Sequence, residues 1–390
     1  MNELSKLFRD IAGQARGYDV SASALRVARR RRNLRRIAPI VLPLLLVALI
    51  AGVWLPLHRA EAPSTNPLFW LPSRIAAPDA STPDLPTDRA VGVAALVYTP
   101  CPQDCWRVVV LRDGTQYRLA SPGSQPVHRL SAGLSPDGRW VAYPDAKGDL
   151  MLRDLTGRTV VTFPDMRPRA WSPGGRYLAL VPVNYRSPPP VTIVDLTTAA
   201  AIRTLSMQAP KAGYAMDMAG ILDSGELIWV TSEFANIAPP DLTSVPQIPL
   251  PKSAQVQITD PGGRQVLHQW ALQAPAGSGY MAPTSAIISM LDGRLLVRFT
   301  VAYAWGTAAG PADIVDATTG AVLTHYAVPA AAGPFDIWGA AGLADGRLLV
   351  VRARAKQPQV ALLEHTNGKP QTISEVEGGY GTLILPGNAY

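Results

Sequence analysis

The sequence predicts an all-β protein, a β-propeller of about six four-stranded blades that follows a short helical tail and one transmembrane helix. Three observations lead to this prediction. A short phrase recurs along residues 91–390, an apolar run of 21 residues precedes it, and the first 36 residues are strongly basic. The chain thereby divides into a tail at 1–36, a membrane span at 37–57, a Pro-rich linker at 58–90 and a propeller at 91–390.

The positive charge of the chain is concentrated at its N-terminus. Residues 1–36 contain ten Lys and Arg against three Asp and Glu, a net charge of +7 that equals the charge of all 390 residues. The remaining residues are therefore neutral in sum. We expect no nucleic-acid-binding surface on them, because such a surface needs an excess of basic side chains.

A short amphipathic helix is predicted in the tail. Its apolar side chains recur at steps of three and four residues, at Leu4, Leu7, Phe8 and Ile11. A helix of this length is marginal alone, so it would order on a surface. That surface is either the anionic inner leaflet of the membrane or a cytoplasmic partner protein. The simpler alternative is a tail that only sets the membrane topology.

The apolar run at 37–57 predicts a single membrane span. It carries no charge, and 21 residues of helix reach about 31 Å, the thickness of the hydrocarbon core. Arginines crowd its N-terminal side, and only Arg59 follows closely, which places the tail in the cytoplasm and the body outside. The alternative is a cleaved signal peptide, because residues 60–62 read Ala-Glu-Ala. The length of the apolar run favours an uncleaved anchor in contact with membrane lipid.

The linker at 58–90 is predicted to be a semi-extended spacer that lifts the body off the membrane. Six prolines interrupt it, at positions 63, 67, 72, 78, 83 and 86. Residues 68–71, Leu-Phe-Trp-Leu, are too apolar for a free linker. We expect them to pack against the body or the membrane surface.

The two cysteines of the chain are Cys101 and Cys105, which are separated by three residues, with Pro100 and Pro102 on either side of Cys101. In an exported body they predict a disulfide that closes a small loop. The alternative is half of a metal site, but a structural zinc site needs four ligands and the sequence has no second Cys pair. We therefore expect no metal.

The repeated phrase begins as LSPDGRWVAY at 134–143 and returns as WSPGGRYLAL, LDSGELIWV, MLDGRLLVRF and LADGRLLVV. Its Ser-Pro-Asp-Gly part predicts a turn, and its apolar part predicts a strand. A second hairpin follows each phrase. The acidic turn residues of these hairpins are Asp113, Asp154, Asp195, Asp260, Asp316 and Glu364.

Two half-units of this kind make the four strands of a propeller blade, so six hairpins predict six blades. The drifting spacing of the copies also allows seven. The first blade lacks an inner strand, and residues 381–386 form a predicted strand that belongs to no other blade. We expect this strand to close the ring, since closure leaves no open sheet edge.

The phrase resembles the TolB-type, WD40-like propeller repeat, whose motif is a Ser-Pro-Asp-Gly turn before a strand. Residues 135–138 match it fully, and the copy at 172–175 replaces its Asp with Gly. The resemblance implies a propeller. The order of tail, span and exported body is also similar to that of single-pass actinomycete proteins, some of which are anti-sigma factors. The zinc-type anti-sigma pattern is absent here.

The sequence contains no pattern that predicts catalysis or a cofactor. A Gly-x-Ser-x-Gly elbow, a Gly-x-Gly-x-x-Gly loop and a P-loop are all missing, and the five histidines stand singly. Binding is better indicated, by aromatic residues in the predicted long loops: Tyr185, Phe234, Tyr303 and Trp305. The alternative is that these rings cap the ends of the blades.

The sequence therefore predicts an exported, non-catalytic scaffold that binds a protein or peptide. The alternative function is an envelope sensor whose tail binds a transcription regulator. A propeller enzyme would need catalytic side chains to converge in space, which spacing along the chain does not reveal.

Overall fold

The computed structural model of the chain describes residues 71–100, 106–119, 131–184, 188–207, 214–233, 253–273, 280–281, 287–303, 306–326, 340–342, 348–354, 357–363, 370–377 and 383–388. All of them belong to the unit formed by residues 65–390. The tail, the predicted span at 37–57 and both cysteines lie outside these ranges and stay predictions. Within the ranges, no helix is long and apolar enough to cross a membrane.

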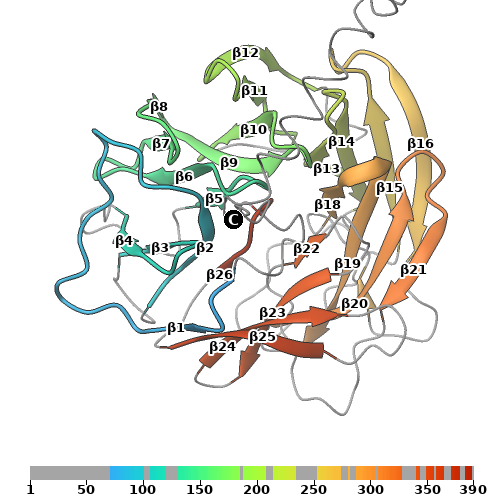
Figure 1. Cartoon of the computed structure of the whole chain (residues 1–390). Coiled ribbons are helices and arrows are strands. Elements are labelled where there is room, and N and C mark those ends of the chain that lie inside the picture. Colours follow the sequence, from blue (N-terminus) through green and yellow to red (C-terminus); the bar gives the residue numbers. More distant parts are fainter. Residues whose placement is uncertain are drawn as a thin grey trace, which may run out of the picture. The chain divides into compact units, whose positions relative to one another are not determined.

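The described strands form six sheets, which we number in chain order (Figure 1). Sheet 1 has the order β26-β2-β3-β4 and consists of β2 (Ala94–Tyr98), β3 (Val108–Leu111), β4 (Gln116–Arg118) and β26 (Leu383–Ile384). Sheet 2 consists of β5 (Gly133–Leu134), β6 (Trp140–Pro144), β7 (Leu150–Asp154) and β8 (Val160–Phe163). Sheet 3 consists of β9 (Met166–Trp171), β10 (Tyr177–Pro182), β11 (Val191–Asp195) and β12 (Ala200–Leu205).

The second half of the chain forms three more sheets. Sheet 4 consists of β13 (Tyr214–Ile221), β14 (Leu227–Glu233), β15 (Ser253–Thr259) and β16 (Val266–Gln273). Sheet 5 consists of β17 (Tyr280–Met281), β18 (Ile287–Met290), β19 (Arg294–Tyr303), β20 (Gly306–Asp316) and β21 (Val322–Tyr326), with the 3-10 turn η4 (Leu291–Gly293) after β18. Sheet 6 has the order β1-β25-β24-β23-β22 and consists of β1 (Arg74–Ile75), β22 (Ala340–Gly342), β23 (Leu348–Arg354), β24 (Gln357–Leu363) and β25 (Pro370–Val376).

Burial explains why the middle strands of the sheets are continuously apolar. Every residue of β2, β3 and β6 is buried, because both faces of these strands are covered. The outer strand β16 instead alternates, with Trp270 and Leu272 buried and their neighbours exposed. Sheets 2, 3 and 4 are antiparallel four-stranded meanders, as the two half-units of each repeat predict.

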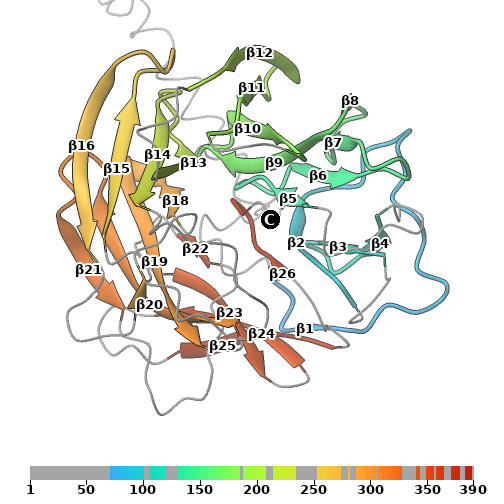
Figure 2. The same ribbon diagram turned by 180° about the vertical axis from the view of Figure 1, so that it is seen from behind.

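Successive sheets pack face to face through apolar side chains. Buried clusters join sheets 1 and 2, sheets 2 and 3, sheets 3 and 4, and sheets 4 and 5. A further cluster joins sheet 6 to sheet 1, and β18 contacts β22 between sheets 5 and 6. The sheets of this unit therefore follow one another around a closed cycle, the arrangement of a β-propeller (Figures 1 and 2).

The C-terminal strand closes this cycle, as the sequence predicts. In β26, Leu383 pairs with Tyr98 and Ile384 pairs with Val97 of β2. Beyond β26, the carbonyl of Asn388 accepts a hydrogen bond from the backbone N–H of Leu134, at 3.0 Å. The end of the chain therefore binds both sheet 1 and sheet 2.

Residues 71–90, which we call the strap, are the described part of the semi-extended spacer that the sequence predicts, and they pack against the body. They run along the outer side of sheets 6, 1 and 2 (Figure 1). The strand β1 pairs in parallel with β25, and the carbonyl of Ala76 accepts a hydrogen bond from Gln116 Nε2 at 2.9 Å. Leu71 is buried in the cluster between sheets 6 and 1, whereas residues 68–70 of the apolar tetrapeptide lie outside the described ranges.

The far end of the strap is held by a buried arginine. Arg153 of β7 is fully buried, and its guanidinium donates to the carbonyls of Pro86 and Arg89. Nearer the middle of the strap, the N–H of Leu85 donates to the Arg118 carbonyl at 2.8 Å. The prolines of the strap do not prevent this anchoring. A proline has no backbone N–H, but its carbonyl still accepts hydrogen bonds.

Candidate functional site

The first two of the repeated turns are held by a serine whose role the sequence analysis missed. Ser135 is fully buried, and its Oγ accepts the backbone N–H of Trp140 at 2.8 Å while donating to Asp137 Oδ1 at 2.6 Å. In the next copy, Ser172 Oγ accepts the N–H groups of Arg176 and Tyr177. The serine thus satisfies buried backbone donors that the turn leaves unpaired.

The aspartates of the second hairpins cap their own turns, as turn chemistry predicts. Asp316 Oδ1 accepts the backbone N–H groups of Thr318 and Thr319 at 3.0 and 2.8 Å. Hydrogen bonds from Thr319 hold the pKa of Asp316 below its usual value. For Asp260, hydrogen bonds from the backbone N–H of Gln265 and its neighbours lower the pKa in the same way.

An arginine of the phrase neutralises the hairpin aspartate in sheets 2 and 3. Arg139 Nη2 lies 2.6 Å from Asp154 Oδ2, and Arg176 Nη2 lies 3.4 Å from Asp195 Oδ2. Burial raises the pKa of Asp154, but hydrogen bonds from Arg139 and Thr156 outweigh it, and the net pKa is lowered.

In sheet 4, an acidic residue stands at the place of this arginine. Arg139 and Arg176 each precede the first residue of the second strand, and Glu226 stands at the same place before Leu227 of β14. Among the copies of the phrase, DGR, GGR, SGE, DGR and DGR, only this one lacks the arginine. This departure was visible in the sequence and is the signal that could have pointed to the site.

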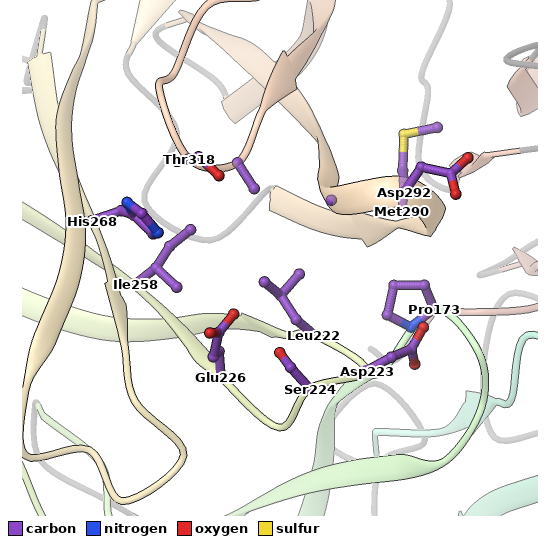
Figure 3. A pocket seen from close by; sticks show the side chains of 12 residues that line it. Pro173, Leu222, Asp223, Ser224, Glu226, Ile258, His268, Met290, Asp292 and Thr318 are labelled. Atoms are coloured by element: carbon purple, nitrogen blue, oxygen red, sulfur yellow. The ribbon is translucent and has the colours of Figure 1, made fainter. Parts of the chain in front are cut away.

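Glu226 lines a pocket of about 350 Å³ between sheets 4 and 5 (Figure 3). Its apolar side consists of Leu222, Ile258, Met290, Ala317 and the ring of Pro173 from sheet 3. Its polar side chains come from the β13–β14 turn, from β16, from η4 and from the β20–β21 turn: Asp223, Ser224, Glu226, His268, Asp292 and Thr318. Three carboxylates from two turns thus face one hollow.

One of these carboxylates is held by a backbone N–H group, and another belongs to a residue with a left-handed backbone conformation. Asp223 accepts the backbone N–H of Gly174 with both oxygens, at 2.8 and 3.0 Å, which ties the turn of sheet 4 to the turn of sheet 3. Asp292 occupies the left-handed region at φ 61° and ψ 31°, where non-glycine residues are strained. The carboxylate of Asp223 is therefore held at a set place beside the pocket.

The pocket lacks the arrangements that metal binding or acyl transfer needs. Within the described ranges, no three His, Cys, Asp or Glu side chains lie close enough to hold a metal ion. Ser224 and His268 both line the pocket, but none of the hydrogen bonds between described residues joins them. A nucleophile and its base would need that contact. The pocket is suited to binding.

Most of the residues that the sequence singled out for binding lie outside the described ranges. These are Cys101, Cys105, Tyr185, Phe234, Trp305, Leu4, Leu7, Phe8 and Ile11. Tyr303 is an exception and corrects a prediction. It is the last residue of β19 and pairs with Gly306 of β20, so this segment lengthens two strands and does not form a long loop. The pairing of β19 with β20 runs from Arg294 and Asp316 to Tyr303 and Gly306, and this strand pairing overrides the loop that the local composition predicts.

The histidines are placed differently from one another. His325 Nδ1 lies 2.6 Å from Asp313 Oδ1 on the neighbouring strand, so it is a satisfied structural residue. His268 of β16 lines the pocket. Their single positions along the sequence concealed this difference, because the neighbours of each come from another strand or sheet.

Comparison with known proteins gives distant likenesses. No protein-family model and no curated protein sequence matches the chain. TolB from Acinetobacter baumannii is 15% identical over 73% of this chain and 65% of its own length, with a TM-score of 0.43. This chain therefore covers just under two thirds of that protein.

Two further solved structures are similar at the same level. The β-propeller domain of the trilobed protease from Pyrococcus furiosus is 11% identical over 74% of this chain and 84% of its own, with a TM-score of 0.41. The WD40 repeats of RRP9 are 12% identical over 74% and 82%, with a TM-score of 0.38. The assignment of this chain as a propeller rests on its own sheet order and packing.

Proposed function

We propose that this chain is a membrane-anchored, extracytoplasmic β-propeller that binds a protein or peptide partner without catalysing a reaction. We count each of the six sheets as one blade. The anchor and its direction are supported by the apolar run at 37–57 and by the arginines that precede it.

The pocket between sheets 4 and 5 is the observation that supports binding. It combines an apolar side with polar and acidic side chains in one hollow of about 350 Å³. Ligand sites combine apolar walls with placed polar groups, and this hollow has six polar side chains beside five apolar residues. One of the turns that line it, between β13 and β14, is the turn in which the repeat of sheet 4 carries Glu226 in place of an arginine.

Fractionation of cells that express the full-length protein tests the anchor. We expect the protein to remain in the membrane pellet after an alkaline wash, and a C-terminal tag to be cleaved by protease added outside the cytoplasmic membrane. A variant without residues 37–57 serves as the control and should be released. Recovery of the full-length protein in the wash, or a tag protected from the protease, would contradict the proposal.

Crosslinking in the same cells, followed by mass spectrometry, tests the binding function. We expect specific protein links from residues 91–390. Links found only from tail positions such as Leu7 and Phe8 would instead support the sensor, in which the tail holds a cytoplasmic regulator. Turnover of a substrate by the purified full-length protein would contradict the non-catalytic role.

A further inference from the structure

The pocket between sheets 4 and 5 lies within an unusual concentration of exposed apolar side chains. Seven large hydrophobic residues are exposed among the described ones, and five of them are on these two sheets: Val266, Leu267, Leu291, Val322 and Leu323. We call these five residues the apolar rim. Exposed apolar side chains that gather on one surface mark an interaction site more often than scattered ones do.

The residues of the apolar rim lie next to lining residues of the pocket along the chain. Val266 and Leu267 directly precede the lining residue His268, and Leu291 stands between the lining residues Met290 and Asp292. Val322 and Leu323 begin β21, just after the turn that contributes Thr318. The outer strands β16 and β21 lie side by side in both views (Figures 1 and 2).

Among the described residues, no Lys, Arg or His pairs with the carboxylates that line the pocket. None of the ion pairs between described residues includes Asp223, Glu226 or Asp292. In sheets 2 and 3, the corresponding turns supply Arg139 and Arg176. In sheet 4 the chain supplies Glu226, a second negative charge where the other copies place a positive one.

We propose that this surface docks a protein segment in which a Lys or Arg side chain is flanked by apolar residues. The cation would enter the pocket beside Glu226, its aliphatic stem would lie against Leu222, and the flanking residues would cover the apolar rim. A hollow of about 350 Å³ is at the small end of ligand pockets, which suits one long side chain. The inference rests on the proposed binding function and names its partner chemistry.

The variant Glu226→Arg tests this inference, because it restores the residue that the other copies of the phrase carry. The full-length protein is placed in nanodiscs of neutral phosphatidylcholine, and fluorescence anisotropy follows a labelled Leu-Arg-Leu-Arg-Leu peptide. We expect the peptide to bind the wild-type protein. Glu226→Arg should lower the affinity for the peptide by about tenfold or more, because a positive charge that repels the peptide replaces a negative one that attracts it. Leu323→Ser should also weaken it, through loss of apolar contact.

Matched controls separate this surface from general charge and from folding. Asp88→Arg makes the same change of charge on the exposed strap and should leave peptide affinity within about twofold. A Leu-Glu-Leu-Glu-Leu peptide should bind more weakly than its basic counterpart. The thermal midpoint of Glu226→Arg should stay near that of the wild type, because the fold accommodates arginine at this place in sheets 2 and 3.

Equal binding of the basic peptide to the wild type and to Glu226→Arg would overturn the inference, as would tighter binding of the acidic peptide. In-cell crosslinking of Glu226→Arg distinguishes this failure from a failure of the proposed function. If the partner links of residues 91–390 persist in that variant, the binding function stands and the partner docks elsewhere. If the wild type yields no partner links at all, the proposed function itself fails.

Discussion

At the residue scale, the glycine of the repeated phrase is required for two separate reasons. Gly138 has φ +76°, in the left-handed region, as its place in the turn predicts. A Cβ at this position would also lie 2.1 Å from the carbonyl oxygen of Ala94, which the sequence could not reveal. The turn of sheet 2 thus packs directly on the backbone of sheet 1.

Two glycine substitutions separate these effects. Gly148 has φ +92° with no atom within 4 Å of an added Cβ, so Gly148→Ala should cost about 1 kcal/mol, the strain of the backbone alone. Gly138→Ala adds the backbone collision and should cost at least about 2–3 kcal/mol. Thermal unfolding of the two variants, followed by circular dichroism, measures the difference. Equal midpoints would show that the contact with Ala94 relaxes freely.

At the element scale, the strap depends on one buried side chain. Arg153 donates to carbonyls at both Pro86 and Arg89, so these two residues are held against sheet 2 by its guanidinium. Residues 86–90 form no strand, so strand pairing does not hold this part of the strap in place. A single substitution should therefore release it.

We expect Arg153→Met to make the strap accessible to trypsin after Arg89. Methionine fills much of the volume but donates no hydrogen bonds, so the carbonyls of Pro86 and Arg89 lose their partner. Limited trypsin digestion with mass spectrometry measures the rate of that cut. Arg158→Met, at an exposed position near the end of β7, should leave the rate unchanged. An unchanged rate in Arg153→Met would show that β1 and Arg118 suffice to hold the strap.

The hairpin aspartates make stability depend on pH in acid. The pKa values of Asp154, Asp195, Asp260 and Asp316 are lowered in the folded protein from an ordinary value of 3.8. Their contribution to the free energy of unfolding is complete when the pH is above the carboxyl pKa of the unfolded chain. It is lost as the pH falls through the lowered pKa values of the folded protein.

The thermal midpoint should therefore fall as the pH drops below about 4. Asp154→Asn should lower the midpoint at neutral pH and reduce the further fall in acid, since one of the shifted carboxyls is gone. Differential scanning calorimetry between pH 2.5 and 7 measures both, and Asp88→Asn on the exposed strap is the comparison. A midpoint of Asp154→Asn that falls as steeply as that of the wild type would contradict this role.

At the scale of the whole propeller, the two ends of the described chain meet at sheets 6, 1 and 2. The C-terminal β26 supplies the inner strand of sheet 1, while β1 of the strap supplies an outer strand of sheet 6. Trp171 Nε1 of sheet 3 also donates to the Asn388 carbonyl, at 3.2 Å. Closure therefore involves segments almost 300 residues apart in sequence.

Removal of residues 383–390 should expose the inner edge of β2 and weaken the cycle of sheets. We expect faster amide exchange at Val97 and Tyr98 and a lower thermal midpoint, because these strand residues lose their partners. Hydrogen exchange with mass spectrometry checks this on the full-length protein and its truncation. Unchanged exchange in β2 would mean that the ring does not depend on β26.

The sequence by itself determined the local structure of the propeller: the turns, the strands, the four-stranded unit and the closing strand. These depend on residue types at short spacing, such as Pro136, Asp137 and Gly138, which act within a few residues of chain. Only the tertiary structure decided the strap, the long β19–β20 hairpin and the pocket. Each of these depends on contacts between residues far apart, as Arg153 with Pro86 and Asp223 with Gly174 show. Spacing along a chain does not reveal which side chains line a hollow between two neighbouring sheets, whereas the packing of sheet 4 against sheet 5 brings Glu226 and Asp292 to one hollow.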